Sequence, residues 1–506
     1  MRKFFKTVAI VTVFSTCEKF LGFLYRIYLS RSIGSEGVGI YQVALSVFAL
    51  LLTVCSSGTP ITVSRLMTKY SAENREDKKN AVITAGIVFA LLVAIPVCII
   101  FFAFKGVLTP FFTNEYSAKI FFVILPALIF TSVYSVLRGV CWGNKDFLPY
   151  SIIELLEEIC MILVGIFLIS KATNIYDGAV RAGVAVTLSY VFSFTLSACV
   201  FVLRKNKLKN PKSQFKPLLS CALPITAMRT ASSLASSLVS IILPLRLISA
   251  GITQSQALSS FGATAGQGMP LLSIPTTFIG SFILVLVPEI SENFYKQRLQ
   301  LLTHDVEKAI KFTCLLTCIF IPVFTVCGEE IGLLVFNSHE CGKFLSISAF
   351  LTLFMSLSAI TTSILNSIGL ENKTLLCFLV SGGFMLLSVW ALPSVIGVYS
   401  LLVGYACVYI MTTVYNLYLI KKHCKLKLRG LKFSLYSVLL TLPSILFGVM
   451  VERLLLPILG TLVCFFVCSV IIVVFYLALC VGFNVLSVSS IAVRFRKNTK
   501  KQGQFA

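Results

Sequence analysis

Four charged side chains stand inside the apolar stretch EKFLGFLYRIYLSR, residues 18–31. A charge near the centre of a bilayer costs at least about 2.5–3.5 kcal/mol on insertion scales, so these charges need a reason. Because each residue advances ~100° around a helix, Glu18, Lys19 and Arg26 fall on one stripe. The stripe also holds Ser15, Gly22 and Tyr25. Arg26 faces Lys19 and no carboxylate on its own helix, which indicates an anionic ligand or an acidic partner on another helix.

A second polar stripe runs along the apolar stretch 218–249. It comprises Thr226, Arg229, Thr230, Ser233, Ser236, Ser237 and Ser240. If the two stripes face each other, Lys19, Arg26 and Arg229 would line a polar, cationic cavity. Stripes of small hydroxyl residues also allow membrane helices to pack closely, and that alternative stays open for this stretch.

Three carboxylates cluster in PYSIIELLEEI, which begins the fifth long apolar stretch: Glu154, Glu157 and Glu158. They fall within about 100° of one helical face, and Arg65 and Arg138 are expected at a similar depth. One interpretation is an ion-pair network that orders an inner gate. The other is a coupling site for protons or cations, because buried carboxylates can be shifted into the physiological pH range.

The sequence carries none of the common enzyme signatures. There is no Walker loop, H-E-x-x-H motif or nucleophile elbow, and His304, His339 and His423 are scattered over predicted loops on both sides. We therefore expect no catalytic residue, no metal and no cofactor. Any energy source would be an ion gradient, the membrane potential or the substrate's own gradient.

The elements that must position these residues follow from composition. The 506-residue chain is 57% hydrophobic and 12% charged, with a mean hydropathy of +0.93. Soluble domains carry about twice that charged fraction, and apolar runs of the length that crosses ~30 Å of hydrocarbon recur throughout. The sequence predicts an all-α polytopic membrane protein with about fourteen transmembrane helices. They are expected at 6–31, 39–66, 81–104, 117–139, 150–170, 180–203, 218–249, 258–288, 309–333, 344–368, 374–396, 398–420, 433–452 and 457–483.

Basic residues gather on one side of these predicted helices. With the N-terminus in the cytoplasm, most of the 43 lysines and arginines fall in cytoplasmic segments. This asymmetry obeys the positive-inside rule, so both termini of this cell-membrane protein are expected in the cytoplasm. The net charge of +23 is then mostly topological and does not indicate nucleic acid.

An internal repeat divides the chain. SVLRGVCWGNKD at 135–146 and SILNSIGLENKT at 363–374 match at one constant offset, which favours a parallel six-plus-six duplication. Such repeats place the substrate path at their interface and work by alternating access. We expect an N-terminal six-helix lobe, a basic cytoplasmic linker, a C-terminal six-helix lobe with its following basic loop, and two additional helices with a basic tail. Their bounds are 1–203, 204–217, 218–432 and 433–506.

The predicted helix 258–288 is rich in residues that kink or interrupt a helix. They include Gly262, Gly266, Gly268, Pro270, Pro275 and Gly280. Interrupted membrane helices occur where protein or a cavity satisfies the freed backbone groups. We expect this helix to bend during transport; a kinked packing helix is the alternative.

Four motifs together carry a family resemblance: KFLGFLYRIYLSRSIGSEGVGIYQ, SGTPITVSRL, VLRGVCWGNKDFLP and GMPLLSIPTTFIGSFILVLVPEISE. They resemble the stage V sporulation protein B and polysaccharide-exporter branch of the multidrug/oligosaccharidyl-lipid/polysaccharide superfamily. The resemblance implies two six-helix lobes in a V around a central cavity. Arg138, Gly139 and Glu157 match the family pattern. The family often carries an arginine four residues after that glutamate, where this chain has Met161.

The resemblance also implies a function: a flippase that moves an undecaprenyl-linked glycan precursor, such as lipid II, to the outer leaflet. We expect the protein to be a monomer. Lys19, Arg26 and Arg229 would bind the pyrophosphate by charge-assisted hydrogen bonds. The other cavity residues are expected to be Glu18, Tyr25 and Ser233. The gate or coupling residues are expected to be Arg65, Arg138, Glu154, Glu157 and Glu158, with Na⁺ or H⁺ as the possible coupling ion.

Two other functions compete with this prediction. A cation-coupled drug antiporter of the same superfamily should favour acidic and aromatic residues in its pocket over arginines. A membrane-embedded glycosyltransferase or polymerase would need a substantial external loop with catalytic acids, whereas the longest external segments, around 105–116 and 328–343, are short. The balance of charge in the two stripes favours an anionic cargo.

Overall fold

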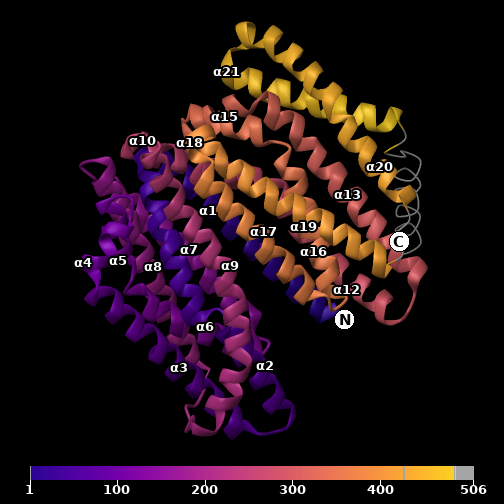
Figure 1. Cartoon of the computed structure of the whole chain (residues 1–506). Coiled ribbons are helices and arrows are strands. Elements are labelled where there is room, and N and C mark those ends of the chain that lie inside the picture. The colour runs from indigo at the N-terminus through magenta and orange to yellow at the C-terminus, as the bar shows by residue number, and fades with distance from the viewer. Residues whose placement is uncertain (1, 205, 425–427, 484, 486–506) are drawn as a thin grey trace, which may run out of the picture. The chain divides into compact units, whose positions relative to one another are not determined.

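The computed structural model describes residues 2–204, 206–424, 428–483 and 485. This part of the chain is helical and contains no strand (Figure 1). Within it, nine helices are long and apolar enough to cross a membrane, or eleven if each of two bent pairs is one span. The predicted all-α membrane fold is confirmed, and the count of fourteen crossings stays a prediction. The expected basic tail from 486 onward lies outside the described residues, as do 425–427 of the preceding basic loop.

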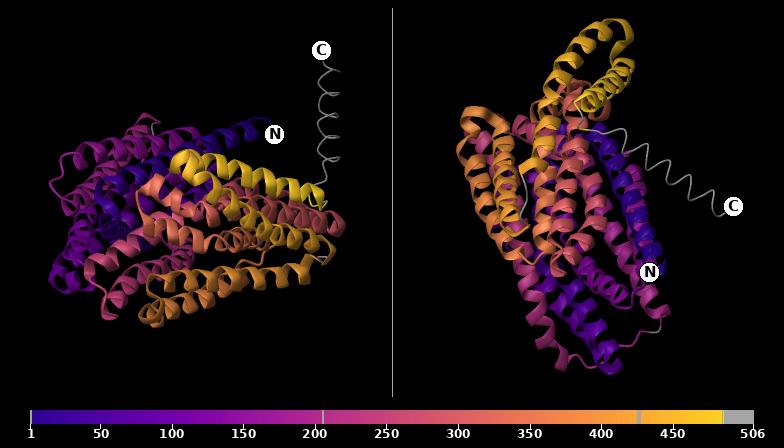
Figure 2. Two further views of the ribbon diagram at one scale, coloured as in Figure 1. Left: turned by 90° about the horizontal axis from the view of Figure 1, so that it is seen from above. Right: turned by 90° about the vertical axis from the view of Figure 1, so that its right-hand side faces the viewer.

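Two helical elements contain a sharp kink at a glycine. α1 (Arg2–Ser56) is kinked at Gly34, whose φ of 67° lies in the left-handed region that favours glycine. This kink falls between the first two predicted crossings. α21 (Thr441–Gly482) is kinked at Gly460, with φ 69°, and its two arms lie side by side (Figures 1 and 2). The sequence predicts a turn at 453–456. In the structure the chain turns slightly later, at Gly460.

The chain folds into two compact units. Unit 1 comprises residues 1–267 and 382–404, and unit 2 comprises 268–381 and 405–506. Unit 1 thus contains the predicted N-terminal lobe together with the stretch 218–267. The predicted division into two six-helix lobes is based on a sequence repeat, whereas the two units are defined by how tightly their residues pack. The two divisions describe different properties, so the lobes stay a prediction.

Unit 1 contains all the residues of the predicted site. Its elements are α1, α2 (Thr59–Ala72), α3 (Glu76–Ala103), α4 (Lys105–Leu108), η1 (Thr109–Phe111), α5 (Glu115–Ile124), α6 (Ala127–Gly143), α7 (Phe147–Ile169), α8 (Ile175–Leu203), η2 (Lys212–Gln214), α9 (Phe215–Ser249), α10 (Gln254–Phe261), nearly all of η3 (Gly262–Gly268), the end of α17 (Glu371–Ala391), α18 (Pro393–Ile396), η4 (Gly397–Tyr399) and the start of α19 (Ser400–Cys424). The long α1 packs against α7, α8, α9 and α10, so it is the central element of this unit.

Apolar packing fixes α2, α3 and α6 beside one another. Val63 and Met67 on α2, Val82 and Ile83 on α3, and Val136 on α6 belong to one fully buried cluster. In a membrane, close van der Waals packing of such side chains holds helices together. The cluster therefore gives Arg65 and Arg138, which lie between its members on α2 and α6, a rigid base.

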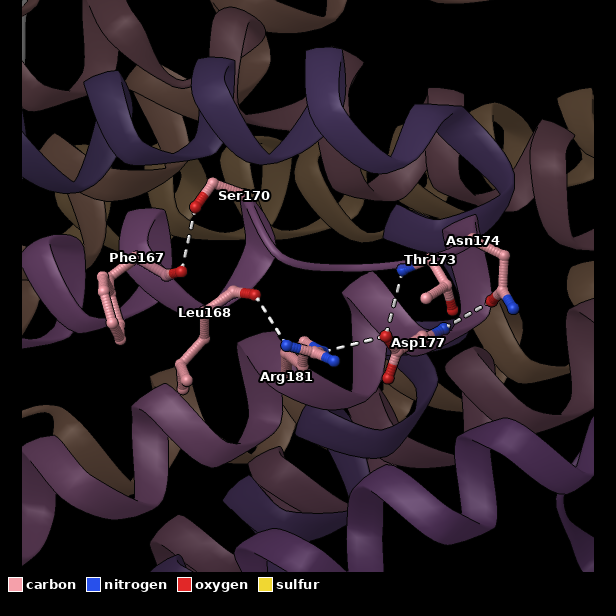
Figure 3. Close-up of polar contacts among 7 residues, drawn as sticks. All are labelled: Phe167, Leu168, Ser170, Thr173, Asn174, Asp177 and Arg181. Carbon is pink, nitrogen blue, oxygen red and sulfur yellow. Dashed lines mark hydrogen bonds and ion pairs between the residues drawn. The ribbon is translucent and has the colours of Figure 1, made fainter.

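Side-chain caps start the helices at one end of unit 1. Asn174 Oδ1 accepts a hydrogen bond from the Asp177 backbone N–H at 2.8 Å, as N-cap residues do at the start of a helix. Asp177 Oδ2 in turn accepts from Arg181 Nε at 2.8 Å and from the Thr173 N–H at 3.2 Å. Arg181 Nη1 also donates to the Leu168 carbonyl, which ties the end of α7 to the second turn of α8 (Figure 3).

The interruption predicted in 258–288 is present. The α10 helix passes directly into the π-helical segment η3, which is followed by the short α11 (Met269–Leu272) and by α12 (Ile274–Tyr295). π-Helical turns are rare and occur frequently at functional sites. The segment has the sequence GATAGQG, and its three glycines carry no side chain that would keep a neighbouring helix away.

Unit 2 is built around α13 (Leu299–Val326), which packs against α12, α16, α20 and α21. Its further elements are α14 (Gly328–Phe336), α15 (His339–Ser348), α16 (Leu351–Ser367), the start of α17, most of α19, α20 (Leu428–Leu439) and α21. Inside it, Asn416 Nδ2 donates to Thr361 Oγ1 at 3.2 Å and Thr362 Oγ1 at 2.9 Å. These bonds satisfy buried polar groups between α16 and α19.

Candidate functional site

The contact between α1 and α7 brings a carboxylate between the charges of α1. A Cβ atom added to Gly22 would lie 2.8 Å from Glu158 Oε1, so the Glu158 carboxylate rests against α1 at this glycine. Gly22 lies one helical turn from Glu18 on one side and from Arg26 on the other. The charge of Glu158 interacts with both. The acidic partner on another helix that the sequence leaves open for Arg26 is therefore available.

Arg26 also binds the interrupted helix. Its Nη1 donates to the Gly266 carbonyl oxygen at 3.0 Å, in the π-helical segment η3. A bond between a charged donor and a carbonyl is worth about 1.5–3 kcal/mol. The half-buried guanidinium thus links α1 to η3, which is far away in sequence, and the charge of Glu158 on α7 acts on it.

The next residue of η3 continues this polar contact along α1. Gln267 Nε2 donates to Ser30 Oγ at 2.7 Å and to Ser35 Oγ at 3.1 Å. Gln267 and Ser30 are 0% and 1% exposed. The residues Glu18, Arg26, Ser30 and Ser35 of α1, with Glu158, Gly266 and Gln267, form what we call the α1 seam. The seam is polar and largely buried, and the second half of the π-helical segment supplies one of its sides.

The α7 carboxylates extend the seam toward α6. Glu154 Oε1 lies 3.5 Å from Arg138 Nη1, and the Arg138 guanidinium lies 5.4 Å from the ring centroid of Trp142 and 6.0 Å from that of Tyr150. Cations are attracted to aromatic faces within about 6 Å. The charge of Glu18 interacts with both Glu154 and Arg138. The predicted gate residues Arg138 and Glu154 therefore form one ion pair with an aromatic support.

Two polar atoms beside this pair lack a hydrogen-bond partner among the described residues. They are Glu157 Oε2 and the hydroxyl of Tyr134, which is 6% exposed. The charge of Glu157 interacts with those of Glu154, Glu158 and Glu18. Four carboxyl groups thus gather at one contact, where like charges repel.

Tyr25 is held between α1 and α7. It is 5% exposed, and a Cβ atom at Gly165 would overlap its hydroxyl oxygen. Its ring stacks on Tyr28, with 6.4 Å between the centroids. The position of Tyr25 is therefore next to the seam, in a packed interface.

The polar stripe of α9 packs against the second half of α1. Ser237 Oγ donates to the Ser46 carbonyl at 2.5 Å, and Ser240 Oγ donates to Ser46 Oγ at 2.8 Å. Thr53 Oγ1 donates to Ser233 Oγ at 3.4 Å. Close helix packing, which the sequence left open, therefore accounts for these serines, and a substrate contact of Ser233 stays a prediction.

The remaining cations of the predicted site are exposed. Arg229 Nη1 donates to the Ser57 carbonyl at 3.3 Å, near the end of α1 and the start of α2. Lys19 and Arg65 are exposed on α1 and α2. The structure therefore divides the predicted charged residues by their exposure. The carboxylates lie half-buried in the α1–α7 contact, whereas Lys19, Arg65 and Arg229 are accessible.

A second carboxylate on α1 was not predicted. Glu36 Oε1 accepts from the Tyr176 hydroxyl at 2.9 Å, and Glu36 Oε2 accepts from Ser255 Oγ at 2.7 Å. Tyr176 stacks on Tyr116, with 4.6 Å between the centroids. Glu36 thus joins α1, α8 and α10 in what we call the Glu36 clasp. The SIGSEGVGIYQ motif around it was the available signal.

Close backbone packing accompanies the clasp. A Cβ atom at Gly39 would overlap the Leu258 carbonyl oxygen, and one at Gly262 would overlap the Ser35 carbonyl oxygen. Only glycine permits two helices to approach this closely. The clasp lies at the α10 end of unit 1, and α2 lies at the opposite end (Figure 1).

Comparisons with known proteins show which family the chain resembles. The family model described as "Polysaccharide biosynthesis protein" matches residues 4–294. Stage V sporulation protein B of Bacillus subtilis (strain 168) is 26% identical over 362 residues, which cover 68% of this chain and 69% of that protein. Lipid II flippase MurJ of the same organism is 22% identical over 362 residues, 64% of each chain.

Solved structures show the same fold. The inward closed conformation of lipid II flippase MurJ matches with a TM-score of 0.72 and 15% identity, covering 94% of this chain and 98% of that one. An inward-facing multidrug resistance transporter of the MATE family matches with a TM-score of 0.65 and 15% identity, covering 81% and 96%. With a family model that matches more than half of its length, the chain belongs to the polysaccharide biosynthesis protein family, within the multidrug/oligosaccharidyl-lipid/polysaccharide flippase superfamily.

Proposed function

We propose that this protein flips a lipid-linked glycan pyrophosphate from the inner to the outer leaflet of the cell membrane by alternating access. One observation carries the proposal: the accessible charges of the predicted site are cations, Lys19 and Arg229, while its carboxylates are half-buried between α1 and α7. A cargo that approaches the site from water meets positive charge. The name of one relative, lipid II flippase MurJ, agrees with such a cargo.

The physics of the cargo suits these residues. A glycan pyrophosphate cannot cross hydrocarbon unaided, because its charge and hydrogen bonds would be unsatisfied. Arginine matches phosphate oxygens with two parallel N–H donors, and lysine supplies a mobile charge. Arg229 already donates one N–H to Ser57, which orients its guanidinium. Tyr25, Glu18 and Ser233 would complete the binding site beside Lys19 and Arg26.

The acidic side of the seam is the proposed coupling site. Glu157 and Glu158 lie among other carboxylates, so a bound proton or sodium ion would relieve their mutual repulsion. Glu158 also interacts with Arg26, which binds the π-helical segment. A change of charge at Glu158 would therefore reach η3 through Arg26. Arg138 and Glu154, with Arg65, would form the inner gate.

The topology of the proposal follows from charge. Both termini lie in the cytoplasm, so the α2 end of unit 1 faces inward and the Glu36 clasp faces outward. The protein acts as a monomer on a membrane-embedded cargo, without nucleic acid and without a catalytic step of its own. The basic residues of the inner segments support this orientation, because the anionic inner leaflet attracts them.

Reconstitution tests the proposal. Liposomes are prepared with the full chain and a fluorescent undecaprenyl pyrophosphate disaccharide, and the fraction that an outside glycan-modifying reagent reaches is followed. We expect flipping by the parent chain and a loss of about tenfold in apparent affinity for Lys19→Gln or Arg229→Gln, since each removes a charge-assisted contact. Lys171→Gln, which removes an exposed lysine at the end of α7, is the matched control and should flip normally. Equal flipping by all three variants would contradict the proposal.

Depletion in cells gives an independent test. Loss of the protein should leave lipid-linked precursor at the inner leaflet, inaccessible to an external probe. An unchanged distribution, in cells without a second flippase for the same precursor, would argue against this function.

A cation-coupled multidrug antiporter is the alternative, and one observation favours it: four carboxyl groups gather in the α1–α7 contact. In that case, purified protein should export cationic dyes, Glu158→Gln should abolish export, and Lys19→Gln and Arg229→Gln should have no effect. The flippase proposal predicts instead that Lys19→Gln and Arg229→Gln lower transport more than Glu158→Gln does.

A further inference from the structure

The chain passes between the two units at three places, and each of them lies at a glycine inside a helical element. Unit 1 gives way to unit 2 between Gln267 and Gly268, in η3. The chain returns to unit 1 between Ser381 and Gly382, in α17, and leaves it again after Gly404, in α19. Only 30 of the 506 residues are glycine, so composition alone does not explain a glycine at all three places.

Residues 382–404, which we call hairpin 382–404, pack within unit 1. They comprise the end of α17, α18, η4 and the start of α19. Arg246 Nε of α9 donates to the Trp390 carbonyl oxygen at 2.9 Å, and the guanidinium lies 5.1 Å from the centroid of the Trp390 ring. Ser388 Oγ donates to the Ser400 carbonyl oxygen at 2.9 Å and joins α17 to α19. The hairpin is therefore fixed to α9, against which α18 also packs.

The remaining parts of α17 and α19 pack within unit 2. Thr374 Oγ1 of α17 donates to Asn366 Oδ1 of α16 at 2.9 Å. The hydroxyl groups of Thr412 on α19 and Ser358 on α16 share a hydrogen bond of 2.8 Å. Both helices are thus fixed to α16 in this unit. In α17 and in α19, one end is therefore held in unit 1 and the other end in unit 2.

Glycines give both helices a place to bend between their fixed ends. Ser381, Gly382 and Gly383 are consecutive in α17, and pairs of glycine and serine are a common cause of sharp helix kinks. Apart from the helix's own backbone, no atom of the described residues lies within 4 Å of a Cβ atom added at Gly382 or Gly383. A Cβ atom at Gly404 would lie 3.3 Å from the Met385 carbonyl oxygen. Because Met385 lies within one turn of Gly383, the bending points of α17 and α19 are at one level.

We propose that α17 and α19 bend at Gly382, Gly383 and Gly404 when the two units move, so that hairpin 382–404 follows unit 1. The π-helical segment, which passes into unit 2 at Gly268, is the third bending point. Hinges are a few residues that absorb large changes of φ and ψ, and glycine does so at the lowest steric cost. The inference rests on the alternating-access motion of the proposed function and not on its cargo, since a drug antiporter would need the same hinge.

Distances between two spin labels test the hinge in the full chain. Leu376, on the unit 2 part of α17, and Val395, on α18, are 61% and 78% exposed. Both are replaced by a ketone-bearing amino acid that is then spin-labelled, which leaves the native cysteines unlabelled. Double electron–electron resonance in liposomes should give a broad or two-peaked distance distribution for the parent chain. In Gly382→Ala/Gly383→Ala it should narrow to one peak, because alanine stabilises the straight helix.

Two controls and a transport measurement separate the outcomes. Gly280→Ala, at a glycine with equally open space inside α12, should leave the distribution unchanged. Labels at Val107 and Val395, which both lie in unit 1, should give one narrow peak in every variant. In the flipping assay, Gly382→Ala/Gly383→Ala should lower the rate by about fivefold or more at unchanged apparent affinity.

Two results would overturn the hinge: a single narrow peak for Leu376 and Val395 in the parent chain, or an unchanged broad distribution in Gly382→Ala/Gly383→Ala. If the distances behave as expected but the parent chain flips no lipid-linked glycan, the hinge is supported and the proposed function alone is refuted.

Discussion

Arg26 shows what a single residue contributes at this site. The sequence alone indicates that Arg26 needs a partner, because no carboxylate stands beside it on its own helix. Its partners are not visible, because Gly266 lies 240 residues away in the chain and no periodicity relates the two. A local pattern thus identifies a residue that needs a partner, whereas only the tertiary fold supplies that partner.

Replacement of Arg26 by glutamine should destabilise the protein by about 1.5–3 kcal/mol, the worth of a charged hydrogen bond to a backbone carbonyl. The measurement is unfolding in detergent by denaturant. Arg26→Lys should keep part of the stability, since it keeps the charge but cannot reproduce the geometry of the guanidinium.

The control is a double-mutant cycle with Glu158→Gln. If the two charges support each other, the double variant should be more stable than the sum of the single effects predicts, by about 0.5–3 kcal/mol. Strict additivity would show that Arg26 and Glu158 act independently and would remove the proposed link from the carboxylates to η3.

Glycine at position 39 is a second residue whose role can be measured. A Cβ atom there would overlap the Leu258 carbonyl, which is backbone and cannot rotate away. Gly39→Ala should therefore push α1 and α10 apart and lower the melting temperature by several degrees. Gly280→Ala is the matched control on a helix with open space around its Cα, and alanine should stabilise that helix by up to about 1 kcal/mol. A normal melting temperature for Gly39→Ala would mean that the helices do not approach this closely.

At the scale of elements, the sequence predicts where helices are interrupted better than it predicts which helices contact one another. Gly34 and the Gly- and Pro-rich segment before α12 interrupt the helices where the residue types indicate. Glycine and proline act on their own backbone, so their effect can be derived locally. The Glu36 clasp was missed because Tyr176 and Ser255 lie 140 and 219 residues from Glu36. Hydroxyl donors of this kind are common in every helix and carry no distinctive spacing.

The clasp should hold α1, α8 and α10 together at the α10 end of unit 1. Glu36→Gln removes the charge that accepts both hydroxyl bonds, so the three helices should separate more often. A cysteine in place of Ala257, which is fully buried on α10, reports the opening through its rate of reaction with a membrane-impermeant maleimide. We expect faster labelling in Glu36→Gln than in the parent, after subtraction of labelling of the native cysteines.

Two variants calibrate that measurement. Tyr176→Phe removes one of the two bonds and should give an intermediate rate. Glu115→Gln removes another carboxylate at the same end, on the first turn of α5, and should label like the parent. If Glu115→Gln had the same effect as Glu36→Gln, surface charge and not the clasp would control access.

At the scale of the whole molecule, composition determines most of what can be predicted. An apolar chain of this length must place its helices in a membrane, and the asymmetry of its lysines and arginines indicates one orientation. The division into two units could not be predicted, because it depends on which helices pack tightly. The repeat predicts that the stretch 218–267 belongs to the second lobe, whereas this stretch packs in unit 1.

The orientation of the chain can be tested with single cysteines. Lys171→Cys, in the α7–α8 connection, should react with an impermeant maleimide in intact cells. Lys209→Cys, in the connection between α8 and α9, should react only after permeabilisation. Labelling in the opposite order would invert the proposed topology and place the Glu36 clasp at the inner face.

The π-helical segment η3 shifts the register of the helix within the predicted crossing 258–288. A π turn holds one residue more than an α turn, so rewinding this segment to α geometry would advance its end along the screw of the helix by one position. Gly266 and Gln267 would then present different atoms to α1, and the bonds to Arg26 and Ser30 would have to be exchanged for others. The segment would thus have two discrete registers, and the hydrogen bond from the Arg26 guanidinium would favour one of them.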